Sequence, residues 1–260
     1  MGTRTPAGRP AVDTCYVHAV KRRFEELDAQ GTRLGLLTLR RRFDPVLEAE
    51  VYEVKLGDEF LMSSAFTVAE RELALLGLAA TPGDGLDVLV GGLGLGYTAL
   101  QALSDDRVAT LTVVDALGEV IGWHERGLLP ETALTSDART SLVEADFFAL
   151  MRGDASLTGN APTLFHAILL DVDHSPRHLL HPSHADLYTS DGLRALQRHL
   201  HPDGVFALWS DDPPDDDFVA ALDARFALCR AQVITFPNAL TRGESTATVY
   251  VASQARAVSA

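Results

Sequence analysis

The sequence predicts an α/β fold: a mostly parallel sheet with crossover helices, preceded by a small β-rich unit. Three observations lead to this prediction. From residue 86 to residue 209, short apolar runs alternate with segments of helix-forming composition, as in sheets built from βαβ units. The first run, 86–90, passes into four glycines within six residues. Near the end, two β-rich runs have no helix between them, which indicates a hairpin at the edge of the sheet.

The start of the chain is expected to form a leader followed by a helix, over residues 1–33. Tyr16, Val20 and Phe24 recur at helical spacing, and Gly31 comes where such a helix would end. This spacing predicts a helix over residues 12–29.

Residues 34–80 are predicted to form the small β-rich N-terminal domain and its connecting helix. Alternating side chains and the Gly57-Asp58 turn indicate antiparallel strands. These strands are predicted at 34–42, 49–55 and 59–64, and the helix at 66–76, where Gly77 ends it.

Residues 81–260 are predicted to form the main domain, in which strands and helices alternate. The predicted strands cover 86–90, 110–114, 140–144, 165–170 and 204–209, then 231–236 and 246–252 in the terminal hairpin. The predicted helices lie near 97–104, 118–126, 147–151 and 190–199.

Composition and charge exclude several classes of function. The formal net charge of −14 argues against binding to nucleic acid, which requires a basic surface. No segment approaches the roughly 18 uninterrupted apolar residues of a membrane span, and the leader lacks the apolar core of a secretory signal. Cys15 and Cys229 match no metal or redox spacing. We therefore expect a cytoplasmic protein without nucleic-acid or membrane partners.

The glycine turn after the first apolar run indicates a nucleotide-like ligand. Asp115 ends the next predicted strand, nineteen residues after Gly96, where a carboxylate typically accepts hydrogen bonds from ribose hydroxyls. The turn has glycines at Gly92, Gly94 and Gly96, and Tyr97 stands where a dinucleotide fingerprint has its third glycine. These features favour an S-adenosylmethionine-type ligand over a nicotinamide dinucleotide. The alternative is that the glycines serve only a tight turn.

A second acidic position follows the third strand of the main domain. In folds that bind S-adenosyl ligands, the loop at this place presents an acid to the adenine amino group, and an apolar neighbour covers the ring. Asp146 and Phe147 would take these two roles. Asp146 could also cap the helix that follows, because Asp is a favoured N-cap residue.

Taken together, these segments resemble the polyamine aminopropyltransferase (spermidine synthase) family over residues 34–253. The resemblance rests on the order and spacing of short motifs at 57–60, 88–96, 113–121, 165–171, 187–189 and 200–205. It implies a Rossmann-like sheet of the S-adenosylmethionine-transferase type, with seven strands of which the last is antiparallel. It also implies a homodimer, an amine or polyamine substrate, and no metal. The cofactor would be S-adenosylmethionine or its decarboxylated form, held by the glycines with Asp115, Ala116, Asp146 and Phe147.

The chemistry that this resemblance implies is attack by a substrate amine on the carbon next to a sulfonium centre. The amine must lose a proton, so a carboxylate that binds the ammonium and then accepts its proton would serve catalysis. Asp171 lies at the end of the predicted strand 165–170, where such sheets bind ligands. Asp173 follows two residues later and would orient the amine. Either carboxylate could instead cap a helix.

Three departures from the family pattern leave the reaction open. Leu95 stands at the turn position where the family has an Asp that holds the aminopropyl amino group, and residues 61–64 replace the family's Tyr-His-Glu. Asp171 and Asp173 are two apart, whereas the family spaces its two acids by three. The main hypothesis is therefore a spermidine synthase-like transfer of an aminopropyl or related group to an amine. The alternatives are a small-molecule methyltransferase, a non-catalytic binding protein and, more distantly, a nicotinamide oxidoreductase.

Two polar runs lie near the predicted site but belong to none of the motifs described above. Four histidines lie between His174 and His184, but Pro176 and Pro182 prevent a regular ligand spacing, so we expect loop histidines rather than a metal site. The acidic run 211–217 follows the fifth strand. It is expected to form a solvated loop or an acidic lip that attracts a polycation.

Overall fold

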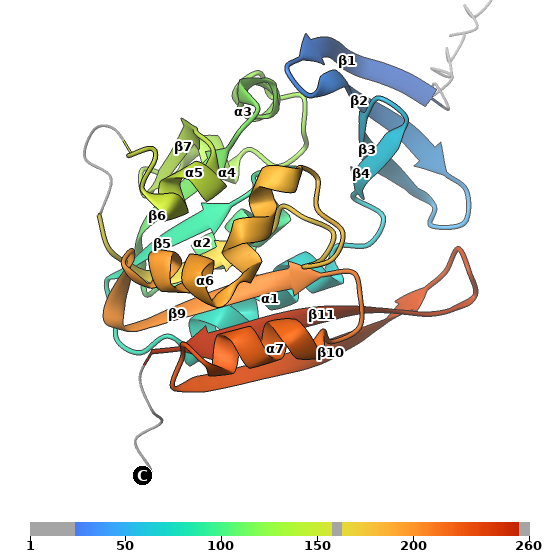
Figure 1. The fold of residues 1–260 in the computed structure, drawn as a ribbon. Helices are drawn as coiled ribbons and strands as arrows, with labels where there is room; N and C mark the ends of the chain where they lie inside the picture. The colour runs from blue at the N-terminus through green and yellow to red at the C-terminus, as the bar shows by residue number, and fades with distance from the viewer. Residues whose placement is uncertain (1–23, 158–162, 255–260) are drawn as a thin grey trace, which may run out of the picture.

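The main domain is a seven-stranded, mostly parallel sheet in the computed structural model, which describes residues 24–157 and 163–254. The strand order is β10-β11-β9-β8-β5-β6-β7 (Figure 1). The strands are β5 (Leu86–Gly91), β6 (Val108–Asp115), β7 (Thr140–Glu144), β8 (Phe165–Leu170), β9 (Leu200–Ser210), β10 (Leu228–Asn238) and β11 (Gly243–Ser253). The last strand, β11, lies between β9 and β10 and is antiparallel to both. The predicted sheet of seven strands with an antiparallel last strand is confirmed.

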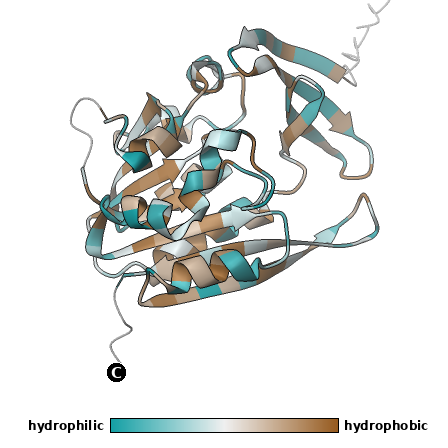
Figure 2. Ribbon diagram, viewed as in Figure 1, coloured by the Kyte–Doolittle hydropathy of each residue, from teal (hydrophilic) through white to brown (hydrophobic). Residues whose placement is uncertain are grey.

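Helices cover both faces of this sheet because side chains of the parallel strands alternate between two apolar layers. One layer packs under α1 (Val68–Ala80), α2 (Tyr97–Leu103), α3 (Gly118–Glu125) and α4 (Ala133–Ser136). The other packs under α5 (Phe147–Arg152), α6 (Ser190–Gln197) and α7 (Asp216–Asp223). Figure 2 shows the central strands as mainly apolar ribbons between these layers. Among the described residues, no helix is long and apolar enough to cross a bilayer.

A second, antiparallel sheet of four strands lies at one end of the main domain (Figure 1). Its strands are β1 (Phe24–Thr32), β2 (Gly35–Asp44), β3 (Ala49–Leu56) and β4 (Glu59–Ser63). The N-terminal sheet contacts the main domain through polar as well as apolar groups. Asp28 of β1 accepts a hydrogen bond from Trp123 Nε1 of α3 at 2.7 Å and forms an ion pair with Arg126. Leu37 and Leu39 of β2 are fully buried in the apolar layer that includes α1.

Two of the predicted elements are wrong in part. The helix expected over 12–29 is replaced from Phe24 onward by β1, while its earlier residues lie outside the described part of the chain. The four-stranded sheet therefore begins before residue 34. In β1 the polar side chains are held by cross-strand pairing, for example Glu25 with Arg41 at 2.6 Å, and this pairing outweighs the helical spacing of a few apolar residues.

Helix α1 does not end at Gly77, as the sequence predicted, but continues to Ala80. A Cβ on Gly77 would lie 2.5 Å from Leu169 of β8 and 3.2 Å from Ala207 of β9. The glycine therefore permits close packing of the helix on the sheet and does not terminate it. Three short elements were not predicted from the sequence: α4, α7 and the 3-10 helix η1 (Pro182–Tyr188).

Candidate active site

The glycine turn joins β5 to α2 at the carboxyl end of the parallel strands. Gly92, Gly94 and Gly96 have φ values of 95°, 47° and 89°, a left-handed conformation that favours glycine. Space is restricted as well. A Cβ on Gly92 would collide with the backbone carbonyl of Asp171, and one on Gly94 would lie 2.5 Å from Met62 Sδ. The turn thus keeps bare backbone between β8 and the N-terminal sheet.

Asp115 lies directly behind this turn, at the end of β6. Its Oδ2 accepts hydrogen bonds from the amides of Leu93 at 3.0 Å and Gly94 at 3.5 Å, and its Oδ1 accepts from Leu117 at 2.9 Å. Burial raises the pKa of Asp115, while these amides favour its charged form. The carbonyl of the next residue, Ala116, accepts a hydrogen bond from Arg33 Nη2 at 3.2 Å. One role of Asp115 is therefore to hold the glycine turn. Its Oδ1, which accepts a single hydrogen bond from an amide, retains a second lone pair for a ligand hydroxyl.

His124 supports the turn from the side of α3. Its Nε2 lies 2.9 Å from the carbonyl oxygen of Gly94. Burial lowers the pKa of His124, so the neutral ring donates through Nε2. This contact fixes the direction of the Gly94 carbonyl.

After β7, Asp146 ends the loop and Phe147 begins α5, and the two side chains face different surroundings. Asp146 caps α5, because its Oδ1 accepts a hydrogen bond from the amide of Ala149 at 3.1 Å. Phe147 is buried and lies directly under Gly91, where an added Cβ would be 2.6 Å from the ring. The ring supports the glycine turn from the sheet side. Its contact with an adenine ring remains a prediction.

A cavity of about 270 Å³ opens in front of the glycine turn. Its walls come from both sheets: Phe60, Leu61, Met62 and Ser63 from β4, the turn residues 93–97, and Asp171, Val172, His174, Trp209 and Asp211 from the carboxyl ends of β8 and β9. Phe66 and Glu70, before and in the first turn of α1, complete it. The cavity therefore joins the predicted nucleotide-binding turn to the predicted catalytic Asp171.

Two carboxylates in this cavity, those of Asp171 and Glu70, have shifted pKa values. Thr98 Oγ1 donates a hydrogen bond to Asp171 Oδ2 at 2.6 Å. Burial raises the pKa of Asp171 to about 6. Burial, and after it the charge of Asp171, raises the pKa of Glu70 to about 8. At neutral pH the two groups together therefore hold about one proton, mainly on Glu70, as expected when two carboxylates occupy one poorly solvated site.

Other polar groups surround this pair. Asp211 contributes a further negative charge near Glu70. His174 Nε2 lies 3.4 Å from Glu59 Oε1 at the edge of the cavity. The buried Nε1 of Trp209 has no hydrogen-bond partner among the described residues. A cavity with this lining suits a ligand that carries a positive charge and a hydrogen-bond acceptor.

No protein-family model and no curated protein matches the sequence. Solved structures do match it. A spermidine synthase in complex with the transition state analogue AdoDATO has a TM-score of 0.66 at 18% identity, covering 88% of this chain and 72% of the synthase. The spermidine synthase from Thermotoga maritima has a TM-score of 0.68 at 19% identity, covering 88% and 73%. Human methyltransferase-like protein 13 in complex with SAH has a TM-score of 0.55 at 20% identity, covering 74% and 85%.

The chain has a spermidine synthase-like fold. This agrees with the resemblance seen in the sequence, and both kinds of neighbour are transferases by name. At 18–20% identity the likeness concerns the fold alone. The roles of individual residues in this spermidine synthase-like fold must therefore come from the geometry of the site.

Asp173 does not lie in the cavity, contrary to the prediction that it orients the substrate amine. It is 1% exposed, and its carboxylate accepts hydrogen bonds from the amide of Leu180, from His184 Nδ1 and from the hydroxyl of Tyr188, each at 2.8 Å. The chain leaves the strand after Leu170, so the two carboxylates point in different directions: Asp171 faces Thr98 and Asp173 faces His184. Asp173 holds the loop that follows β8, and Asp171 alone of the two reaches the cavity.

The four histidines of this loop have separate partners and do not gather around one point. His184 stacks on Phe148 with ring centroids 3.6 Å apart, and His181 caps η1. His178 Nδ1 lies 2.9 Å from Asp212, while His174 reaches the cavity. They act as loop histidines, as the sequence predicted.

The acidic run 211–217 is mostly structural. Asp212 also accepts a hydrogen bond from Ser175 at 2.6 Å, and Asp215 caps α7 while pairing with Arg177. These contacts tie the histidine loop to the end of β9. Of this run, Asp211 lines the cavity, so the expected acidic lip is limited to that one residue.

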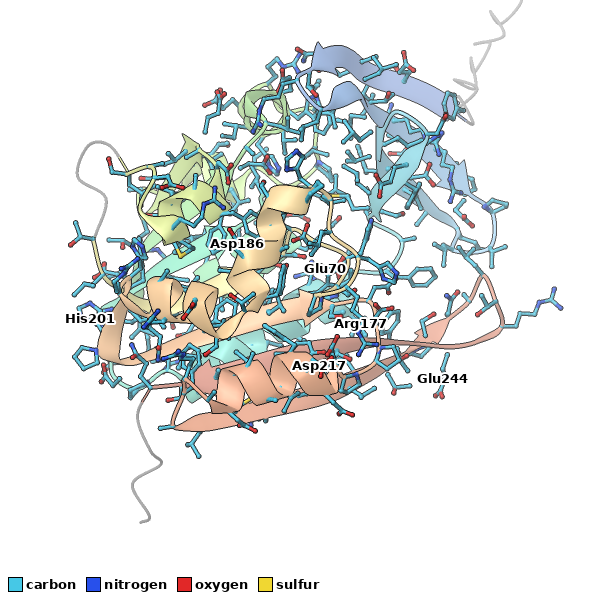
Figure 3. All side chains as sticks on the ribbon, viewed as in Figure 1. Glu70, Arg177, Asp186, His201, Asp217 and Glu244 are labelled. Carbon is cyan, nitrogen blue, oxygen red and sulfur yellow. The ribbon has the colours of Figure 1, made fainter. Side chains whose placement is uncertain are left out.

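Glu70 is the functional candidate that the sequence analysis missed. It belongs to the first turn of α1 and lies about a hundred residues before Asp171 along the chain. Figure 3 shows Glu70 near the middle of the molecule, on the side of the main domain that faces the N-terminal sheet. Its spacing could have indicated a buried position. Glu70 precedes the buried Leu73, Ala74 and Gly77 by three, four and seven residues, which places it on the same face of the helix. A carboxylate on the buried stripe of a helix requires an explanation.

Proposed function

We propose that this chain is a transferase that binds an S-adenosyl cofactor at the glycine turn and transfers an aminopropyl or related group to an amine acceptor. The observation that carries the proposal is the pair of carboxylates, Asp171 and Glu70, that line the same cavity as the glycine turn. The spermidine synthase and the methyltransferase-like protein with the same fold hold AdoDATO and SAH. Aminopropyl transfer therefore agrees with the fold, the cavity and its charge.

The residues present fit a cofactor of this class. Gly94 and Gly96 line the cavity, and a Cβ on Gly92, Gly94 or Gly96 would collide with its neighbours. Asp115 would accept hydrogen bonds from ribose hydroxyls, beside Ala116, and Asp146 would lie near the adenine. When bound, an S-adenosyl cofactor supplies an electrophilic carbon next to its sulfonium centre. The protein's part is to hold the acceptor amine and to remove its proton.

Asp171 is the proposed proton acceptor. With a pKa of about 6 it is mostly ionised at neutral pH, yet basic enough to take a proton from an ammonium group that it binds. Glu70, with a pKa of about 8, remains mostly protonated and so limits the repulsion between the two carboxyls. Thr98 fixes the Asp171 carboxylate through the 2.6 Å hydrogen bond.

Methyl transfer from intact S-adenosylmethionine is the second candidate, and Leu95 favours it. The Leu95 side chain is 6% exposed and lies in the apolar layer with α1 and α2. Leu95 stands at the turn position where the family has an Asp, so this position supplies no carboxylate for an aminopropyl ammonium. In that case Asp171 would still bind and deprotonate the acceptor amine, with Glu70 beside it.

Calorimetric titration with three compounds separates these functions: S-adenosylmethionine, its decarboxylated form and methylthioadenosine. Tighter binding of the decarboxylated form supports aminopropyl transfer. Tighter binding of S-adenosylmethionine supports methylation and overturns the first proposal. Absence of binding by all three would rule out both enzymatic functions and leave a non-catalytic binding protein.

A further inference from the structure

A row of polar residues crosses the main sheet at the end opposite to the cavity. Asp87, His166 and His201 are each the second residue of a strand, β5, β8 and β9, and these three strands are adjacent and parallel. Thr110 on β6 is the register partner of Asp87 and extends the row. All four lie at the amino ends of their strands. Asp171 and the glycine turn lie at the carboxyl ends, and Figure 3 shows His201 far from Glu70.

The first three side chains of this row bring metal-binding atoms together. One ligand atom from each of Asp87, His166 and His201 lies within 4.8 Å of the other two, the only such group of three or more among residues 24–157 and 163–254. His166 Nδ1 is 3.8 Å from Asp87 Oδ2. Bonds from one Zn²⁺ to nitrogen and oxygen are about 2.0–2.2 Å long, so a single ion can bridge a gap of this size.

The surrounding contacts orient these ligands. The hydroxyl of Thr110 donates to Asp87 Oδ1 at 2.6 Å, which leaves Oδ2 directed toward His166. The rings of His166 and His201 stack with centroids 4.0 Å apart and planes inclined by 28°. The Asp87 and His166 side chains are 27% and 25% exposed, so an ion from solvent can reach them. A hydroxyl that holds a ligating carboxylate is typical of metal sites.

We propose that Asp87, His166 and His201 form a binding site for a divalent transition metal of the Zn²⁺ class. Two imidazoles and one carboxylate are the donors that such ions prefer, and three protein ligands leave a coordination position for water. Binding through His166 Nδ1 replaces the 3.0 Å hydrogen bond that this atom accepts from the Asp87 amide. The ion would join β5, β8 and β9 at their amino ends. This site is independent of the proposed transferase function.

Calorimetric titration of chelator-treated, tag-free protein with Zn²⁺ tests this proposal. Wild type is expected to bind one Zn²⁺ per chain at this row, and the metal should raise its melting temperature, because binding to the folded state alone stabilises it. His201→Ala is expected to weaken this binding by ~10-fold or more, as is Asp87→Asn. The matched control is His178→Ala, which removes an imidazole that also faces a carboxylate but lies outside the row.

The proposal is overturned if wild type binds no Zn²⁺, or if His201→Ala binds it as tightly as wild type does. Circular dichroism of each variant without metal shows whether its fold is intact. Should His201→Ala fail to fold, His201→Gln, which retains a polar side chain of similar reach, takes its place in the same titration. Equal loss of binding in His178→Ala and His201→Ala would also contradict the assignment, because it would place the ion outside the row.

Discussion

At the scale of single residues, the candidate site depends on how the protein controls the charge of two carboxyl groups. Asp171 and Glu70 both contact the cavity, yet they lie deep enough that burial raises both pKa values. Asp173, only two positions from Asp171, is buried with three hydrogen-bond donors around it. Neighbouring acids of the same sequence motif therefore have different surroundings.

Asp171→Asn is expected to reduce turnover by ~100-fold or more, because the amide cannot accept the proton of the acceptor amine. Affinity for the cofactor should be nearly unchanged, since the side chain is not among the residues proposed to hold it. Single-turnover kinetics and calorimetry on the same variant measure the two effects. Asp186→Asn, an exposed acid of η1, is the control and should keep full turnover. If Asp171→Asn retained wild-type turnover, another group would have to be the base.

Glu70→Gln is expected to change how stability depends on pH. The folded-state pKa of Glu70 is about 8, against an ordinary value of 4.5, so between these values the folded state binds more protons than the unfolded state. Wild type therefore loses stability as the pH rises through this window. The variant has no proton to lose at this position, so its melting temperature should fall less between about pH 5 and about pH 9.

Thermal unfolding at both pH values measures this effect, with Glu72→Gln as the control. Glu72 belongs to the same helix but does not line the cavity. The same decline in melting temperature for wild type and Glu70→Gln would show that Glu70 does not hold a proton in the native state.

At the scale of elements, the sequence predicted those segments whose apolar pattern is decided locally. The bounds of β7 and β8 were predicted to the residue. In β8 a short, mainly apolar run between polar breaks leaves little choice. The polar strand β1 was missed, since its stability comes from pairing with β2. Helix α7 was not predicted, because it begins within the acidic run that was expected to be a loop. Asp215 of this run is its N-cap.

The same distinction applies to the site. Asp171 and the glycines were predicted because strand ends and turns have local signatures. Glu70 was not predicted, because its distance from Asp171 is set by the packing of α1 on β8 and β9. Gly77 permits that packing, two turns farther along the same side of the helix.

Gly77→Ala is expected to destabilise the fold by ~1–3 kcal/mol, because the added methyl group must displace Leu169 or tilt α1. This outcome is the reverse of the usual gain of about 1 kcal/mol when Ala replaces Gly in a helix. Urea unfolding measures it. Gly122→Ala in α3 is the matched control, since its Cβ meets only Arg126 Nε at 3.9 Å. A Gly77→Ala variant as stable as Gly122→Ala would contradict the packing argument.

At the scale of the whole molecule, the cavity lies between two sheets that come from different parts of the chain. The N-terminal sheet supplies residues 60–63 and the main domain supplies the glycine turn and the carboxylates. Away from the cavity, Asp28 joins the N-terminal sheet to the main domain through Trp123 of α3 and Arg126. A ligand in the cavity would therefore contact both sheets at once.

Hydrogen exchange with and without methylthioadenosine tests this arrangement. Bound ligand is expected to slow amide exchange at residues 60–63 of β4 as well as at 93–97, because local opening of either side would break ligand contacts. Residues 228–238 of β10, which do not line the cavity, provide the internal control. Slower exchange at 93–97 without any change in β4 would show that the N-terminal sheet does not take part in binding.

Asp171 and Glu70 can gain or lose a proton near neutral pH. The charge of the cavity can therefore change when a charged ligand binds. Near neutral pH the empty pair has a charge close to −1. An occupant with one positive charge balances it directly, whereas a second positive charge in the cavity lowers both pKa values and drives the remaining proton into solvent. Binding of a dication would then acidify the medium, and its measured heat would depend on the buffer that takes up the proton. The cavity would then respond to the charge of its ligand through the proton that it holds.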